Sequence, residues 1–181
     1  MDGRDVRSFD LQELREKYGV VFQNDLLFRK SVGENIRIGR SISTQRLLQA
    51  AKDAQALDFV EQAGGLDTPL EARGANLSGG QKQRLLIARA LAGRPEILIL
   101  DDSSSALDYR TDAALRQVIR RDYGDTTTVI IAQRVSSVRA CDRILVLEEG
   151  RMAGFGTHAQ LMASCPLYRE ISHLQMGEED T

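Results

Sequence analysis

Helical and strand-like hydrophobic patterns alternate along this chain. Residues 44–62 carry apolar side chains at near-helical spacing, which predicts a helical stretch. Unbroken apolar runs, typical of buried parallel strands, occupy residues 97–100 and 144–147, and residues 126–131 form another β-rich run. A short helix, carrying Leu11 and Leu14, is predicted to lead into a strand over residues 19–22.

The remaining segments complete an α/β pattern. Residues 28–77 read as a mostly helical insertion. Because strand and helix alternate in the second half, we expect a parallel α/β sheet. The other predicted elements are a helix from residue 32, helices over 78–91 and 108–121, short helices at 135–141, 158–163 and 167–175, and a hairpin arm at 151–155.

Composition places the chain among globular proteins and narrows the possible partners. With 181 residues, 42% of them hydrophobic and 28% charged, the chain is long enough for one domain with a real core. We expect that domain over residues 1–176, with a helical subdomain at about 28–92, the rest of the core at 1–27 and 93–176, and a solvated tail at 177–181. A net charge of -2 gives no sign of a nucleic-acid partner.

Targeting and metal-binding signals are missing from the sequence. No secretory signal opens the chain, and no apolar run approaches the roughly 20 residues of a membrane span. Cys141 and Cys165 lack zinc-type spacing, so we expect two reduced thiols. His158 and His173 form no metal-ligand pair.

The most informative stretch is Asn76-Leu77-Ser78-Gly79-Gly80-Gln81-Lys82-Gln83-Arg84. A serine and two small residues precede an unbroken helical pattern, and a helix N-terminus with free N–H groups suits a phosphate. A plain serine N-cap is the alternative, although the full run is much rarer than a cap. The run resembles the signature sequence of ATP-binding cassette (ABC) ATPases. This resemblance implies that Ser78, Gly79, Gly80 and Gln81 bind the γ-phosphate of ATP held by a partner in a head-to-tail dimer.

The strand that ends in two aspartates resembles the Walker B strand of the same family. The resemblance makes Asp101 the Mg²⁺ ligand, since a carboxylate at the end of a parallel strand lies where α/β proteins bind ligands. Asp102 stands where the family usually has the glutamate that activates the attacking water. Its side chain is one methylene shorter, which holds the carboxylate back by roughly 1.5 Å. Alternatively, one of the two aspartates caps the following turn.

Two further segments match family motifs on either side of the signature. Ser105-Ala106-Leu107-Asp108 resembles the D-loop, which crosses the dimer interface, and Asp108 is also a candidate N-cap. Gln23, after the first strand, resembles the Q-loop glutamine that contacts Mg²⁺ and senses the membrane domains. The Glu34-Asn35-Ile36 segment that follows resembles the part of exporter cassettes that contacts the transmembrane domains.

A second catalytic position also departs from the family pattern. Exporters usually carry a histidine where Gln133 stands, and glutamine can form a hydrogen bond but carries no positive charge. With Asp102, this makes two catalytic departures beside an intact signature, as in the degenerate partner of some heterodimeric exporters. The segment from Gly154 to Met162 resembles the exporter C-terminal region, where we interpret His158 as structural or capping.

The family's phosphate loop, G-x-x-x-x-G-K-[ST], occurs nowhere in the chain, although the resemblance covers residues 2–175. It implies a partial P-loop NTPase (RecA-like) parallel sheet with a helical signature subdomain. We expect an N-terminal truncation that removes the antiparallel sheet and the phosphate-loop strand, whose place is between residues 128–131 and 144–147.

The resemblance implies a subunit that binds and hydrolyses ATP for an ABC exporter, on the cytoplasmic face of the cell membrane. Its cofactors would be ATP and Mg²⁺, and its partners a second nucleotide-binding domain and transmembrane domains. The fragment alone should neither bind ATP well nor hydrolyse it. A non-transport ABC ATPase and a non-functional remnant of a disrupted transporter gene remain alternatives.

Overall fold

The computed structural model describes residues 1–179, with side chains described through Gln175. The chain forms two compact units, Met1–Ile131 and the segment from Ala132 onward, and each is described by itself. The predicted tail, residues 177–181, lies in part outside the described residues, and the domain limits predicted from the sequence stay predictions.

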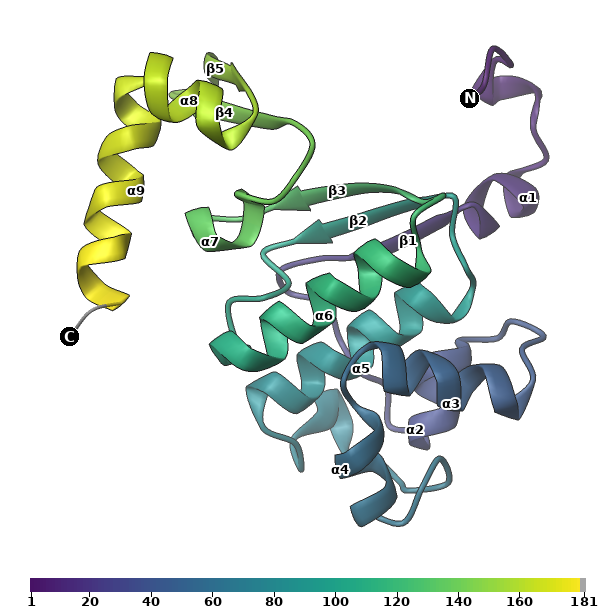
Figure 1. Ribbon diagram of the computed structural model, residues 1–181. Helices are drawn as coiled ribbons and strands as arrows, with labels where there is room; N and C mark the ends of the chain where they lie inside the picture. Colours follow the sequence, from purple (N-terminus) through teal and green to yellow (C-terminus); the bar gives the residue numbers. More distant parts are fainter. Residues whose placement is uncertain (180–181) are drawn as a thin grey trace. The chain divides into compact units, whose positions relative to one another are not determined.

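The first unit is built on a parallel sheet with strand order β1-β2-β3. Its strands are β1 (Tyr18–Val21), β2 (Ile97–Asp101) and β3 (Thr127–Ile131). Both crossover connections place their helices on the same face of the sheet, as right-handed connections require (Figure 1). The predicted α/β class with a parallel sheet is therefore confirmed.

Helices fill the connections of the first unit. Ahead of β1 stand a 3₁₀ turn, η1 (Val6–Ser8), and α1 (Leu11–Glu16). Between β1 and β2 the chain forms α2 (Val32–Arg37), α3 (Thr44–Asp53), α4 (Leu57–Gln62), η2 (Ala72–Gly74) and α5 (Gly79–Ala92), and α6 (Tyr109–Asp122) leads to β3.

One predicted helical stretch is in fact two helices. The pattern over residues 44–62 is interrupted between α3 and α4, where Gln55 adopts the left-handed conformation with φ 58°. Ala56 N–H turns back to donate to the Ala51 carbonyl at 2.7 Å. The hydrophobic spacing continues through the break because the apolar residues on both sides enter the same core.

Helix α5 packs closely on the sheet because β1 carries a glycine beneath it. A Cβ atom on Gly19 would lie 2.8 Å from the Ala90 carbonyl oxygen and 2.8 Å from Pro95 Cγ. No side chain fits at such separations, so glycine lets the backbone of α5 approach the strand. On this face of the sheet the strands bury Val21, Leu98 and Leu100.

The second unit is an antiparallel hairpin with three helices. It contains α7 (Val135–Val138), β4 (Ile144–Glu148), β5 (Arg151–Gly156), α8 (His158–Ser164) and α9 (Pro166–Glu179). Helix α7 is shorter than the predicted 135–141. Thr157 and Gln160 form a capping box on α8, and His158 Nδ1 lies 2.9 Å from the Tyr168 hydroxyl.

The strand predicted over residues 144–147 forms as β4, and the predicted hairpin arm pairs with it as β5, but the predicted burial of β4 is wrong for one of its faces. Strand β4 pairs antiparallel with β5 through a turn at Glu149 and Gly150, both with positive φ. Only one face is buried, since Leu145 is 52% and Leu147 is 62% exposed. A continuous apolar run does not distinguish a strand buried on both faces from one buried on a single face.

Apolar side chains also remain exposed on β3. Val129 is 45% and Ile131 is 51% exposed, and within the described residues β3 pairs with β2 alone. The predicted separation between residues 128–131 and 144–147 stays a prediction. Among the described residues, no helix combines the length and apolar character needed to cross a bilayer.

Candidate functional site

The predicted site residues of the first unit gather at one edge of the sheet. Strands β1 and β2 end there, and α5 and α6 begin there because each helix runs back against the strand direction (Figure 1). Ligands of open α/β sheets bind at the carboxyl ends of the strands. Gln23, Asp101 and Asp102 therefore lie at the edge where the sequence predicts nucleotide chemistry.

The signature segment begins α5 with a complete capping box. Ser78 Oγ accepts from Gln81 N–H at 3.2 Å, and Gln81 Oε1 accepts from Ser78 N–H at 2.9 Å. Ser78 and Gly79 are exposed. The N–H groups of Gly79 and Gly80 precede any possible intrahelical partner, so this end presents donors and a partial positive charge. The arrangement fits a phosphate delivered from outside the chain.

The D-loop segment lies directly against the two signature glycines. A Cβ atom on Gly79 would lie 3.6 Å from Ala106 Cβ, whereas one on Gly80 would lie 3.0 Å from the Ala106 carbonyl oxygen. Only glycine at position 80 leaves the D-loop carbonyl in place. The glycine at position 80 therefore allows close packing of α5 against the D-loop, and the exposed glycine N–H group is that of Gly79.

The predicted catalytic carboxylate stands on a strained piece of backbone. Asp102 has φ 46°, and its N–H donates to the Ile131 carbonyl at 2.9 Å. Aspartate tolerates the left-handed region better than most side chains. Gln23 Nε2 donates a long hydrogen bond, 3.4 Å, to Asp102 Oδ2. The structure thus brings together the two residues that the sequence assigned to the Q-loop and to the catalytic position.

Metal ligands at this edge are few. Asp101 is partly exposed at the end of β2, next to Asp102. Across the described part of the chain, no group of three or more His, Cys, Asp or Glu side chains could hold a metal ion. The assignment of Asp101 and Gln23 to Mg²⁺ stays a prediction; with so few protein ligands, a Mg²⁺ ion here would take its others from phosphate and water.

Asp108 is an N-cap, as the sequence predicted. Its carboxylate accepts from the Thr111 hydroxyl at 2.7 Å and from Thr111 N–H at 2.9 Å. These two bonds, the hydroxyl first, lower the pKa of Asp108 below its usual value because they favour the ionised form. The capping bonds still leave the residue exposed at the edge.

Gln133 belongs to the second unit, where α9 holds its backbone. Gln175 Nε2 donates to the Gln133 carbonyl at 2.9 Å, and Gln175 Oε1 accepts from Val135 N–H at 2.7 Å. The exposed Gln133 side chain thus projects from a fixed main chain. No sequence signal marks Gln175, since a polar residue in a helix is common.

Sequence reasoning also missed a buried arginine on the signature helix. Arg89 is 7% exposed and donates to the carbonyls of Asn35 and Leu26, both at 3.0 Å. It lies 3.5 Å from Asp25 Oδ1. Burial lowers the pKa of Arg89, and Asp25 opposes that shift. Arg89 therefore links α5 to the segment that follows Gln23.

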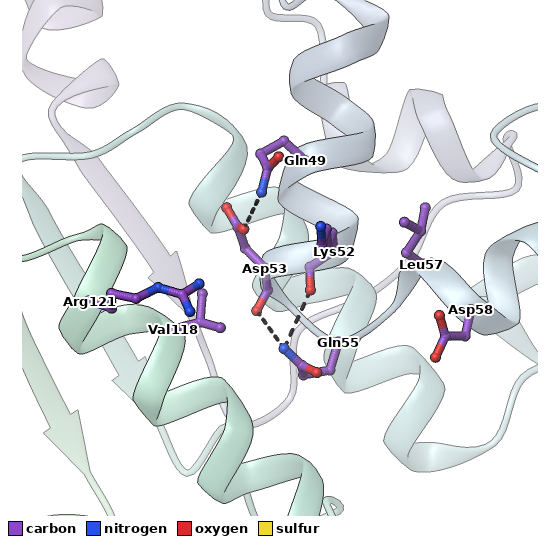
Figure 2. A pocket seen from close by; sticks show the side chains of 8 residues that line it. All are labelled: Gln49, Lys52, Asp53, Gln55, Leu57, Asp58, Val118 and Arg121. Carbon is purple, nitrogen blue, oxygen red and sulfur yellow. Dashed lines mark hydrogen bonds between the residues drawn. The ribbon is translucent and has the colours of Figure 1, made fainter.

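A cavity of about 310 Å³ lies away from this edge (Figure 2). Its walls come from α3, α4 and α6, and none of the predicted site residues lines it. The lining residues are Gln49, Lys52, Asp53, Gln55, Leu57, Asp58, Val118 and Arg121.

Relatives of the chain are exporter ATP-binding proteins. The chain is 44% identical to the Beta-(1-->2)glucan export ATP-binding/permease protein NdvA of Bradyrhizobium diazoefficiens, over 97% of this chain and 29% of that protein. It is 43% identical to the ATP-dependent lipid A-core flippase of Albidiferax ferrireducens, over 97% of this chain and 31% of that protein. The chain thus spans about a third or less of these relatives.

The fold agrees with these similarities. A solved structure of a bacterial Atm1-family ABC exporter with ATP bound matches 97% of this chain and 31% of that chain, with 40% identity and a TM-score of 0.89. Residues 1–105, which carry Gln23, the signature run and the two aspartates, match the family described as ABC transporter. The chain belongs to the ABC transporter family.

Proposed function

We propose that this chain is part of the nucleotide-binding domain of an ABC exporter, with a degenerate site of its own and a signature that serves a partner's ATP. The two relatives named above, an export protein and a flippase, support the exporter assignment. The observation that carries the proposal is the start of α5, which is capped and exposed and lies against the D-loop.

The chemistry of the other residues supports a weak or inactive site. When bound, Mg-ATP supplies the phosphoryl group and the metal charge. In the first unit, Asp101 and Gln23 would hold the metal and Asp102 would face the reacting phosphate. The resemblance gives Gln133, in the second unit, the role of the switch residue. Asp102 has a shorter reach than the glutamate usual in this family and is held by Gln23. Gln133 orients a phosphate oxygen or water by a hydrogen bond and contributes no charge.

The surface beside the Q-loop suits a membrane-domain partner. Phe22 is 60%, Leu26 is 49% and Phe28 is 51% exposed, and all three lie within one segment after β1. Exposed apolar side chains gathered in this way mark an interaction surface. We propose that the transmembrane domains of the exporter cover them, on the cytoplasmic face of the membrane.

The signature role is tested with Ser78→Arg in an exporter that contains this segment together with its partner subunit. A long cation at the helix start fills the space in front of the free N–H groups, so ATP hydrolysis at the partner's site should fall at least about tenfold. Thr157→Arg is the matched control, because it disrupts the similar capping box of α8. Equal ATPase rates in the two variants would contradict the head-to-tail role.

The degenerate site is tested by restoring both family residues. Asp102→Glu with Gln133→His should raise turnover at this chain's own site, by up to about 10²–10⁴-fold if the general base is the missing element. Single-turnover hydrolysis, with the partner's catalytic residue removed, isolates that site. No gain in the double variant would mean that these two positions do not limit the site.

A further inference from the structure

Three side chains form a buried polar cluster at the end of the first unit opposite the nucleotide edge. Asp53, at the end of α3, is 4% exposed, and Tyr123, just after α6, is 6% exposed. The Tyr123 hydroxyl donates to Asp53 Oδ2 at 2.7 Å. Arg46 of α3 donates to the same hydroxyl at 2.9 Å and lies 3.6 Å from Asp53 Oδ2.

The cluster also holds the end of the signature helix. Arg46 donates to the carbonyls of Leu91 and Ala92, the latter at 3.1 Å, and these are the last residues of α5. A guanidinium on the final carbonyls of a helix satisfies acceptors that have no intrahelical partner and complements the helix dipole. The end of α5 and the end of α6 are therefore both tied to α3.

The other oxygen of the Asp53 carboxylate also has a hydrogen-bond partner. Gln49 Nε2 donates to Asp53 Oδ1 at 2.7 Å, and Figure 2 shows the two side chains facing each other on α3. Val118 and Arg121 of α6 lie across the cavity from them. These hydrogen bonds, together with those of Arg46, favour one arrangement of the cluster over others. Directional bonds fix a geometry that apolar contacts alone would leave free to slide.

The opposite ends of the same two helices carry the signature and the D-loop. Helices α5 and α6 have 14 residues each, so each spans roughly 20 Å. At their starts, Gly79 and Gly80 lie so close to Ala106 of the D-loop that a Cβ atom on either glycine would come within 3.6 Å of it. The two helices are thus joined twice, by the polar cluster at their ends and by the glycine–alanine contact near their starts.

We propose that Arg46, Asp53 and Tyr123 are positioning residues, which set how the start of α5 lies against the D-loop. A helix is stiff over this length, so loosening one end lets the other end shift. Through this contact the cluster would set the direction of the exposed Gly79 N–H group. The use of that N–H group for ATP binding rests on the proposed function, whereas the positioning of α5 against the D-loop does not.

Replacement of the cluster by apolar residues would not necessarily cost stability, because buried ionic groups gain little over a well-packed apolar core. Stability alone is therefore a poor readout. The contact between Gly79 and Ala106 offers a direct one, since 3.6 Å between the two Cβ positions lies within the range for a disulfide.

The experiment introduces Gly79→Cys and Ala106→Cys into the full chain, with Cys141→Ser and Cys165→Ala to remove the native thiols. The equilibrium between the 79–106 disulfide and glutathione measures how well the two positions are held together, without ATP or a partner. Tyr123→Phe is then added, which removes one hydroxyl and its two hydrogen bonds. Tyr168→Phe is the matched control, since it removes a hydrogen-bonded tyrosine hydroxyl in the second unit.

Tyr123→Phe should lower the equilibrium constant for the disulfide by about fivefold, while the control changes it by less than about 1.5-fold. Arg46→Lys keeps the charge and loses the second carbonyl bond, so it should act in the same direction and serves as the test if Tyr123→Phe does not fold. Equal disulfide equilibria in folded Tyr123→Phe, Arg46→Lys and Tyr168→Phe would overturn the positioning role. The result leaves the proposed ATP function untouched, which is tested separately by Ser78→Arg.

Discussion

Replacing Arg89 with methionine removes the buried cation that links the signature helix to the segment after Gln23. Methionine fills much of the same volume, so the main loss is polar. The Asn35 and Leu26 carbonyls each lose a donor at 3.0 Å, whereas Asn35 Oδ1 keeps the N–H of Phe28 at 2.8 Å. Asp25 keeps the N–H of Leu26.

The expected cost follows from those two carbonyls. An acceptor left unpaired in a buried place costs about 1–3 kcal/mol. The bond to the Asn35 carbonyl is buried and the bond to the Leu26 carbonyl is partly buried, so we take a joint loss of about 3 kcal/mol. The free energy that protects α5 from opening should fall by that amount. Since about 1.4 kcal/mol is a factor of ten, the amides of α5 should exchange with deuterium roughly 100-fold faster in Arg89→Met.

Hydrogen exchange followed by mass spectrometry measures the opening of α5 separately from that of the second unit. A single melting temperature for a chain with two units would not separate them. Arg15→Met is the control, because it makes the same substitution at an exposed position of α1. If α5 in Arg89→Met exchanged within about fivefold of the control, the two carbonyls would not depend on Arg89. The argument from buried, unpaired acceptors would then be refuted.

Three further predictions concern single groups. Burial raises the pKa of Tyr123 to about 12, so its stabilising contribution is present below pH 10 and lost as the pH rises towards 12. In an absorbance titration of tyrosine ionisation, the step near pH 12 should be missing from Tyr123→Phe. Thr111→Val should raise the pKa of Asp108, measured by NMR, because it removes the hydroxyl that donates to the carboxylate; an unchanged value would contradict that cause. Val129→Thr, on the exposed face of β3, should increase solubility without loss of stability, whereas Ile130→Thr, which packs against the core, should destabilise the unit in urea unfolding.

Local chemistry explains what the sequence could predict. The cap at Ser78, the cap at Asp108 and the end of α5, within one residue of the predicted position 91, depend on neighbours within a few residues. The resemblance to the family motifs added the prediction that the site residues lie at one edge of the sheet, since the order of strands and helices in a known fold determines which ends meet.

Long-range pairing explains what the sequence missed. Arg89 meets Asn35 across 54 positions, and Arg46 meets Tyr123 across 77, so no local pattern marks either pair. The break at Gln55 is hidden for a different reason, since hydrophobic spacing records which face is buried and not whether the helix is continuous. Strand β4 shows the same limit, because an apolar run does not reveal what covers its second face.

Arginine side chains account for much of how the signature helix is held. Arg89 reaches from α5 to the Asn35 carbonyl, and Arg46 reaches from α3 to the last carbonyls of α5. Arg84 donates to the Gln55 carbonyl at 2.7 Å and lies over the Phe59 ring. A planar guanidinium fixes both distance and direction, which apolar packing does not. Because rotation of α5 about its own axis would turn its first N–H groups away from a phosphate, directional tethers are the contacts such a site requires.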